Sequence, residues 1–108
     1  MESNETYTNN TNPETIEFTA VLNKMLGTYT LKNKAYDGAF AKRYAKRGLT
    51  YAVDKISEKC DRLVALEANP DIDDFGESIA DTLLDMANYC AMTLVELNKR
   101  NNGVLHRL

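Results

Sequence analysis

Residues 77–92 read Glu-Ser-Ile-Ala-Asp-Thr-Leu-Leu-Asp-Met-Ala-Asn-Tyr-Cys-Ala-Met, and this stretch decides the fold. Apolar residues recur there and just beyond at the spacing of an α-helix, in a stripe formed by Ile79, Leu83, Met86, Cys90, Leu94 and Leu97. Asp81, Asp85 and Asn88 lie on the opposite side, with Tyr89 and Met92 beside them. Solvated helix faces usually carry long charged side chains, so these short polar and large apolar groups indicate a second covered face. We expect another helix, another subunit or a ligand to cover it.

Capping residues predict where the first helices begin and end. Asn12 and Pro13 form a good helix start, so we expect a first helix over residues 13–30. This helix is predicted to bury its apolar residues Phe18, Val21, Leu22, Met25 and Tyr29. Tyr36-Asp37-Gly38 predicts a turn, after which residues 39–47 have helix-forming composition and Gly48 ends the segment.

Two further helices account for the second half of the chain. One is expected over residues 49–68, with an apolar stripe formed by Leu49, Val53, Ile56, Cys60, Leu63 and Val64. The other is expected over residues 77–100, with Gly103 as its C-cap. The chain shows no strand pattern and no internal repeat. The sequence therefore predicts an all-α fold, a small antiparallel bundle of three to four helices that forms a homo-oligomer to bury surplus apolar surface.

Length and composition limit the class of protein. A chain of 108 residues supports one compact domain, which we expect over residues 13–108 after a flexible segment of residues 1–12. No stretch approaches the roughly 20 apolar residues of a membrane span, and the polar start is unlike a signal peptide, so we expect a cytoplasmic protein without membrane contact. Cys60 and Cys90 are expected to be buried and reduced. The single histidine, His106, disfavours a zinc site or a histidine-dependent triad.

Charge is distributed unevenly along the chain. Residues 32–47 contain six basic residues and one acid, a local charge of +5, so the net charge of −3 leaves −8 for the remainder. A protein that binds a nucleic acid polymer over its whole surface should be basic overall, and this chain is acidic. A small basic segment suits a compact anionic ligand. A plain solvated helix face explains the same charges, and that alternative stays open.

Several short motifs resemble one known family. The motifs are Lys32-Asn33 with Tyr36 and Phe40, Glu58-Lys59 with Arg62-Leu63 and Leu66, and Glu77-Ser78-Ile79 with Asp81-Thr82-Leu83-Leu84-Asp85 and Ala87-Asn88-Tyr89. Over roughly residues 30–97 they resemble the phage-encoded nucleotide-modification-associated domain family, formerly a domain of unknown function. The resemblance implies a bacteriophage protein in the host cytoplasm with a nucleotide ligand. That family is in turn similar to the all-α nucleoside triphosphate pyrophosphohydrolases of the MazG and dimeric dUTPase type, which hold magnesium on helix-borne carboxylates.

Cations, amides and aromatic rings in these motifs fit a nucleotide pocket. Lysine and arginine bind phosphate oxygens, asparagine and aspartate bind base edges or ribose hydroxyls, and aromatic rings stack on bases. The candidate ligand-binding residues are Lys32, Asn33, Tyr36, Phe40, Arg43, Lys59, Arg62, Asp81, Asp85, Asn88 and Tyr89. The same charges also fit an interhelical salt-bridge network without any ligand, and this alternative stays open.

Two main hypotheses for the activity follow. In the first, the protein binds and sequesters a nucleotide-type immune signal of the host, a cyclic oligonucleotide or a cyclic ADP-ribose-like molecule, without catalysis or cofactor. Such a sponge inhibits antiphage defence. In the second, it is a MazG-like pyrophosphohydrolase or an accessory protein of phage nucleotide modification, with Mg²⁺ held by Glu77, Asp81 and Asp85. A module that binds only another protein is a third reading, which leaves the basic segment unused.

Overall fold

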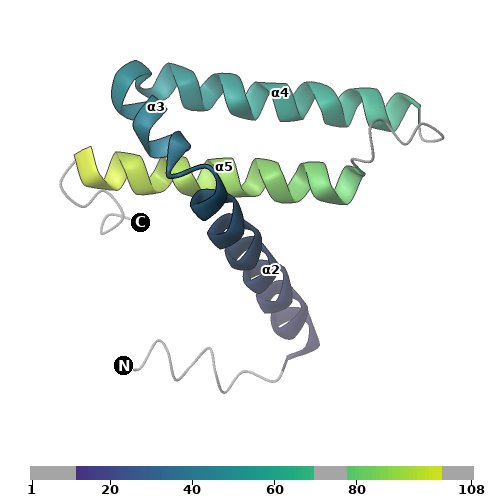
Figure 1. The fold of residues 1–108 in the computed structure, drawn as a ribbon. Coiled ribbons are helices and arrows are strands. Elements are labelled where there is room, and N and C mark those ends of the chain that lie inside the picture. Colours follow the sequence, from purple (N-terminus) through teal and green to yellow (C-terminus); the bar gives the residue numbers. More distant parts are fainter. Residues whose placement is uncertain (1–11, 70–77, 101–108) are drawn as a thin grey trace.

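The described part of the chain is entirely helical apart from short connections. The computed structural model describes residues 12–69 and 78–100, which form α2 (Pro13–Ala35), α3 (Ala39–Arg47), α4 (Leu49–Ala68) and α5 (Ile79–Arg100). Figure 1 shows α4 and α5 side by side and antiparallel, with α3 at the end where α4 begins and α5 finishes. α2 crosses this pair obliquely and projects away from it. The predicted all-α fold is confirmed.

Local sequence sets the ends of α2. The Asn12 side chain accepts hydrogen bonds from the backbone N–H groups of Glu14 and Thr15, at 2.8 and 3.3 Å, so the predicted N-cap is confirmed. α2 continues to Ala35, past the predicted end at residue 30. It stops where Asp37 and Gly38 adopt left-handed conformations, with φ of 55° and 66°. The Gly38 N–H then donates to the Asn33 carbonyl at 3.0 Å, which satisfies a carbonyl at the helix end.

The start of α5 is a reciprocal cap. The Asp81 N–H donates to Ser78 Oγ at 3.0 Å, and the Ser78 N–H donates to Asp81 Oδ2 at 3.4 Å. This arrangement satisfies two backbone donors at the helix start and makes Ile79 the first helical residue. The flexible segment expected over residues 1–12 lies outside the described residues except for its last residue, and Glu77, Gly103 and His106 lie outside them as well.

The buried residues of α4 and α5 are not the predicted stripes. The apolar side chains buried in the described part are Tyr44, Tyr51, Ala52 and Leu66, and the buried polar ones are Thr82, Asn88, Thr93 and Glu96. The predicted stripes are largely exposed, namely Leu49, Val53, Cys60 and Val64 of α4 and Ile79, Leu83, Cys90 and Leu94 of α5. The prediction that these stripes, and the two thiols within them, face the interior was wrong for this chain. Periodicity identifies an apolar face but not which partner covers it.

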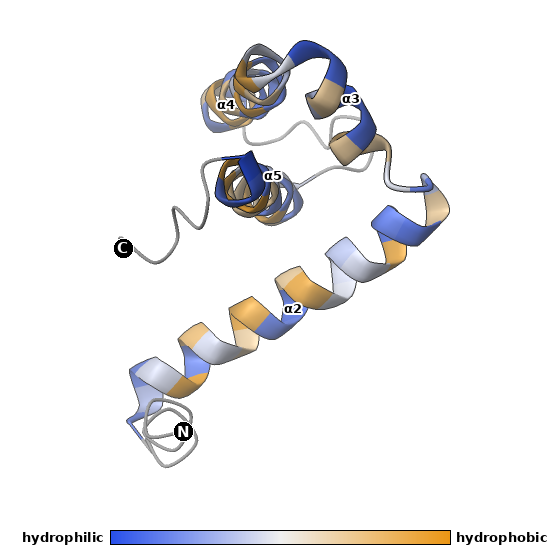
Figure 2. Cartoon of the chain, turned by 90° about the vertical axis from the view of Figure 1, so that its left-hand side faces the viewer, coloured by the Kyte–Doolittle hydropathy of each residue, from blue (hydrophilic) through white to orange (hydrophobic). Residues whose placement is uncertain are grey.

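α2 is the helix least attached to the rest of the molecule. None of its residues is buried, so the predicted burial of Phe18, Val21, Leu22 and Tyr29 was wrong, and Met25 is only half-buried. Figure 2 shows α2 standing off from α4 and α5, which are seen almost along their axes. None of the described helices is both long and apolar enough to cross a membrane.

Candidate functional site

A cavity of about 560 Å³ lies where the last turns of α2 meet α3 and the middle of α4 and α5. Its wall contains cations, one acid, two amides, four aromatic rings and a methionine. The lining residues are Tyr29, Lys32, Asn33, Tyr36, Ala39, Phe40, Arg43, Lys59, Asp85, Asn88, Tyr89 and Met92. The volume falls within the roughly 300–1,000 Å³ typical of small-molecule sites.

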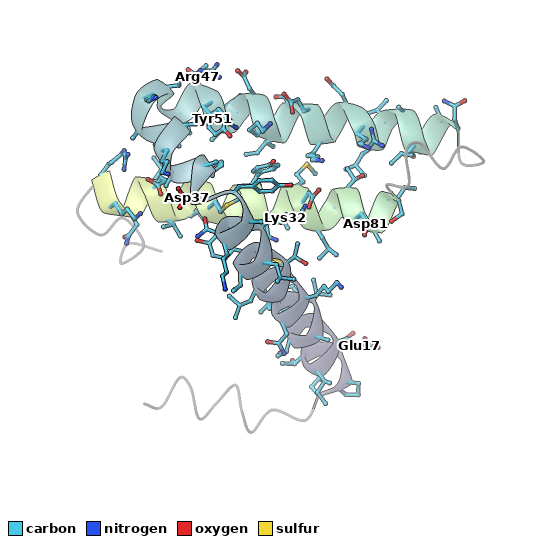
Figure 3. All side chains as sticks on the ribbon, in the orientation of Figure 1. Glu17, Lys32, Asp37, Arg47, Tyr51 and Asp81 are labelled. Atoms are coloured by element: carbon cyan, nitrogen blue, oxygen red, sulfur yellow. The ribbon has the colours of Figure 1, made fainter. Side chains whose placement is uncertain are left out.

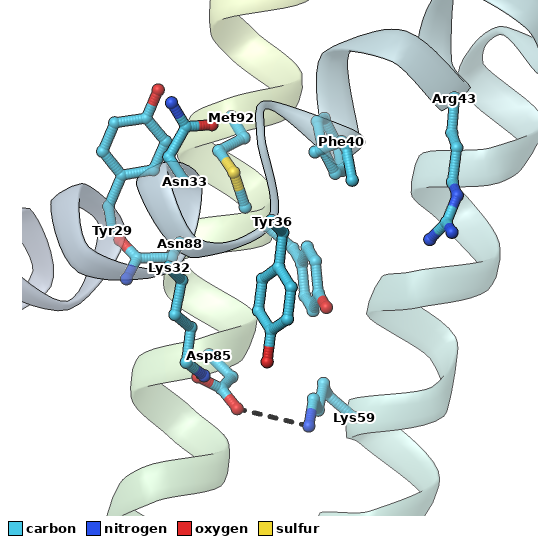
Figure 4. A pocket seen from close by; sticks show the side chains of 12 residues that line it. Tyr29, Lys32, Asn33, Tyr36, Phe40, Arg43, Lys59, Asp85, Asn88 and Met92 are labelled. Carbon is cyan, nitrogen blue, oxygen red and sulfur yellow. Dashed lines mark hydrogen bonds and ion pairs between the residues drawn. The ribbon is translucent and has the colours of Figure 1, made fainter.

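The Asp85 carboxylate joins three helices at this cavity. Lys32 Nζ of α2 lies 2.9 Å from Asp85 Oδ1, and Lys59 Nζ of α4 lies 3.3 Å from Asp85 Oδ2. The side chains of Asp85 and Lys59 are only 19% and 18% exposed, whereas Lys32 is more than half exposed. Each carboxylate oxygen therefore holds one ammonium group in place, and both ammonium groups lie at the cavity wall (Figure 4).

Aromatic rings form a second part of the wall. The Phe40 ring lies 5.9 Å from the Tyr89 ring, 5.4 Å from Tyr51 and 6.2 Å from Tyr44, measured between centroids. These tilted contacts anchor α3 to α4 and α5. Lys55 Nζ lies 5.9 Å from the centre of the Tyr89 ring and adds a cation beside it. Phe40 and Tyr89 are thus fixed by packing before any ligand arrives.

Tyr36 differs from the other rings of the wall because it is the most exposed of them. Its residue is 67% exposed, and no ring contact is recorded for it among the described residues. Figure 4 shows the Tyr36 ring between Lys32 and Asp85 on one side and Arg43 on the other. An exposed planar ring at the cavity wall is suited to stacking on a base.

The Asn88 side chain fixes the spacing between α2 and α5. Its Nδ2 donates to the Met25 carbonyl at 3.1 Å, and the residue is buried. Together with the Lys32–Asp85 ion pair, this hydrogen bond attaches the otherwise exposed α2 to the body. The position of the α2 side chains in the cavity depends on these two contacts.

The lining carries a net positive charge. Lys32, Arg43 and Lys59 contribute three positive charges, and Asp85 contributes one negative charge, which leaves +2. In a chain with a net charge of −3, this is a local concentration of the opposite sign. Such a cavity attracts small anions.

Most of the predicted binding residues come together here. Nine of the eleven line the cavity, namely Lys32, Asn33, Tyr36, Phe40, Arg43, Lys59, Asp85, Asn88 and Tyr89. Arg62 instead lines a shallower hollow with Glu58, Lys59 and Asp61. Asp81 lies at the start of α5, where its carboxylate completes the cap with Ser78 (Figure 3), and it does not line the cavity. The binding role of the nine stays a prediction.

The prediction missed Tyr29, Ala39 and Met92. Tyr29 precedes Lys32 and Asn33 by three and four residues, so it lies on the same side of α2 as both. Met92 bears the same relation to Asn88 and Tyr89 on α5. Helical spacing alone was therefore enough to find both, but Tyr29 was assigned to a core and Met92 to packing.

Carboxylates do not gather in the described residues in the way a metal site needs. No group of three or more His, Cys, Asp or Glu side chains converges within residues 12–69 and 78–100. Of the three predicted magnesium ligands, Asp85 is paired with two lysines and Asp81 is engaged in the cap. Glu77 lies outside the described residues.

The fold and the cavity define an all-α domain with a cationic, ring-lined site between its helices. A family described as "Nucleotide modification associated domain 1" matches residues 32–97, which is more than half of the chain, and the chain belongs to this family. The matched span contains every lining residue except Tyr29. No curated protein and no solved structure matches the chain. The predicted family is confirmed, and the similarity to MazG-type enzymes stays a prediction.

Proposed function

We propose that this protein binds a nucleotide-type ligand in the cavity between α2, α3, α4 and α5 and holds it without converting it. The observation that carries the proposal is the combination of two preplaced ammonium groups, on Lys32 and Lys59, with rings at the same wall. The ammonium groups and the Arg43 guanidinium suit phosphate oxygens, and the rings suit a base. A nucleotide has both parts on one molecule.

The biological role proposed for this binding is sequestration. As a phage protein in the host cytoplasm, it would remove a cyclic oligonucleotide or cyclic ADP-ribose-like immune signal from solution and so inhibit antiphage defence. The membership in a nucleotide-modification-associated family supports a nucleotide ligand. The pairing of both Asp85 oxygens with lysines supports a role for that carboxylate in positioning the two ammonium groups at the cavity wall.

The test is recovery of an intact ligand. Purified protein is mixed with cyclic di- and trinucleotides, cyclic ADP-ribose isomers and common nucleoside triphosphates, once with magnesium and once with a chelator. After ultrafiltration, the retained protein is heat-denatured, and the filtrate and released compounds are analysed by chromatography. A compound missing from the filtrate and recovered unchanged in both conditions supports the proposal. Magnesium-dependent conversion to a monophosphate or a linear product supports the pyrophosphohydrolase instead.

Substitutions of the cavity cations provide the matched control. Lys59→Ala removes one ammonium group from the cavity, and Lys46→Ala removes one from an exposed position of α3 outside it. A hydrogen bond to a charged group contributes about 1.5–3 kcal/mol, so the affinity for a phosphorylated ligand should fall roughly 10- to 100-fold in Lys59→Ala. Lys46→Ala should bind as the wild type does in a calorimetric titration. Equal loss in both variants would indicate general charge attraction rather than a site.

A further inference from the structure

One side of the α4/α5 pair is a broad apolar surface with no cover among the described residues. We call it the outer face and define it by Leu49, Val53, Cys60 and Val64 of α4 and Ile79, Leu83, Cys90 and Leu94 of α5, all of which are exposed. Monomeric soluble proteins rarely leave contiguous apolar surface of this kind open to water.

Helix geometry places both stripes on the same side. On α5, Leu83 and Cys90 lie about 140–160° around the helix from Asp85, which pairs with Lys59 of α4. On α4, Cys60 lies about 100° around the helix from Lys59, in the same rotational sense. Since the two helices are antiparallel, offsets in the same rotational sense place both stripes on one side of the pair. This side is away from α3 and from the cavity.

The described helices bury little apolar surface among themselves. Within the described residues, the buried apolar side chains are Tyr44, Tyr51, Ala52 and Leu66, while fifteen large apolar residues are exposed. Burial of apolar surface is the dominant favourable term in folding, and most helical stability in proteins comes from packing. The exposed apolar residues of the described part are therefore available for contact with another molecule.

α2 carries a second exposed apolar surface. Its apolar residues Phe18, Val21, Leu22 and Leu26 are exposed, and Figure 2 shows α2 extending past α5 on the side away from α3. Each chain thus carries both an apolar face and a projecting apolar helix. In a pair of copies related by a two-fold axis, each chain can cover the outer face and the apolar side of α2 of the other. A different partner would need matching surfaces for both.

We propose that the outer face binds a second copy of this chain and that α2 of each copy packs against its partner. The centre of the face is uncharged, because Ala87 and Ala91 lie beside the α5 stripe and Ser57 beside the α4 stripe. A face that meets its own copy therefore brings no like charges together. The cavity opens on the other side of the pair, so assembly leaves it accessible.

The mass in solution tests this directly. Multi-angle light scattering of the full chain should give twice the chain mass of 12.2 kDa. Leu83→Glu places a charge in the centre of the outer face and should give the mass of one chain. The control, Ala65→Glu, adds the same charge at an exposed position on another side of α4 and should keep the wild-type mass. A wild-type mass of one chain overturns the proposal, whether or not Leu83→Glu folds.

The two native thiols report which surface is covered. Cys60 and Cys90 lie in the outer face, so both should react with a maleimide at least tenfold more slowly in the assembled wild type than in the urea-unfolded chain. Dilution to the point where the mass falls should release both thiols together. A mass of two chains with both thiols reacting at the unfolded rate would mean that the copies meet elsewhere, and it would overturn the assignment of this face.

Discussion

The buried positions of α5 are all polar, whereas the outer face of α4 and α5 is apolar and exposed. The Lys59–Asp85 ion pair lies between the two helices, and the buried residues of α5 are Thr82, Asn88, Thr93 and Glu96. On the outer face, leucine, valine, isoleucine and cysteine side chains face water. In an ordinary two-helix contact the distribution is the reverse.

The buried side of α5, called here the inner surface, is therefore specialised for something other than stability. Its buried polar groups are paired: Thr82 Oγ1 donates to the Ser78 carbonyl at 2.9 Å, and Glu96 accepts from Lys99 at 3.2 Å and from Arg100 at 3.0 Å. Paired polar groups of this kind are tolerated inside but add little net stability. The inner surface therefore builds the cavity, and the outer face is left to supply the apolar burial through a second copy.

The sharpest test of this division substitutes one leucine on each surface. Leu66 is 6% exposed inside the chain, and Leu83 is 48% exposed on the outer face. If a second copy covers Leu83, both Leu66→Ala and Leu83→Ala should cost about 2–5 kcal/mol of unfolding free energy, the range for buried leucines. Urea unfolding at one fixed protein concentration measures both. A cost below about 0.5 kcal/mol for Leu83→Ala alone would mean that water covers the outer face.

Asp85 and Asp54 provide a comparison of ion pairs. Asp85→Asn removes the charge that two lysines share in a mostly buried place, and it should cost about 1–3 kcal/mol. Asp54→Asn breaks an ion pair with Arg47 at 3.2 Å in which both side chains are more than half exposed, and it should cost no more than about 0.5 kcal/mol. Thermal or urea unfolding distinguishes them. Equal costs in unfolding free energy would show that the site of Asp85 is as open to solvent as the exposed site of Asp54.

Asn88 and Asn69 make the same kind of hydrogen bond in different places. Asn88→Ala removes the donor to the Met25 carbonyl and should cost about 1 kcal/mol while raising amide hydrogen exchange throughout α2. Asn69→Ala removes an exposed bond to the Ala65 carbonyl, 3.2 Å long, and should leave exchange in α2 unchanged. Mass-spectrometric exchange gives the readout. Unchanged protection of α2 in Asn88→Ala would show that other contacts hold this helix.

The elements of this fold were predictable because their ends depend on local chemistry. The Asn12 cap, the turn at residues 36–38 and the end of α3 before Gly48 each follow from a few neighbouring residues. The extension of α2 to Ala35 was missed, because the turn residues themselves, rather than any breaker near residue 30, end that helix. The clustering of the nine candidate residues was also predictable, since helical spacing places those of one helix on the same side.

The direction in which each face points was not predictable in the same way. The apolar stripes are real, but nothing in a periodic pattern says whether the chain itself or another copy covers them. Asp81 illustrates a second limit. Its spacing from Asp85 suits a shared ligand, yet its carboxylate is held by the cap at the helix start, a local interaction that competes with any distant role.

The smallest effect is expected at Asp37, outside both surfaces. The hydrogen bond from Lys42 Nζ at 2.8 Å, and then the charge of that ammonium, hold the pKa of Asp37 below its ordinary value of 3.8. Because the folded pKa is the lower one, the stabilisation is present above pH 3.8 and is lost as the pH falls through the folded pKa. Both side chains are largely exposed, so water and salt screen the pair and neutral-pH stability should not change measurably in Lys42→Ala. An NMR titration of the Asp37 carboxyl should show the lowered pKa in the wild type and its return toward 3.8 in Lys42→Ala. A lowered pKa that persists in Lys42→Ala would place its origin in the left-handed turn rather than in the lysine.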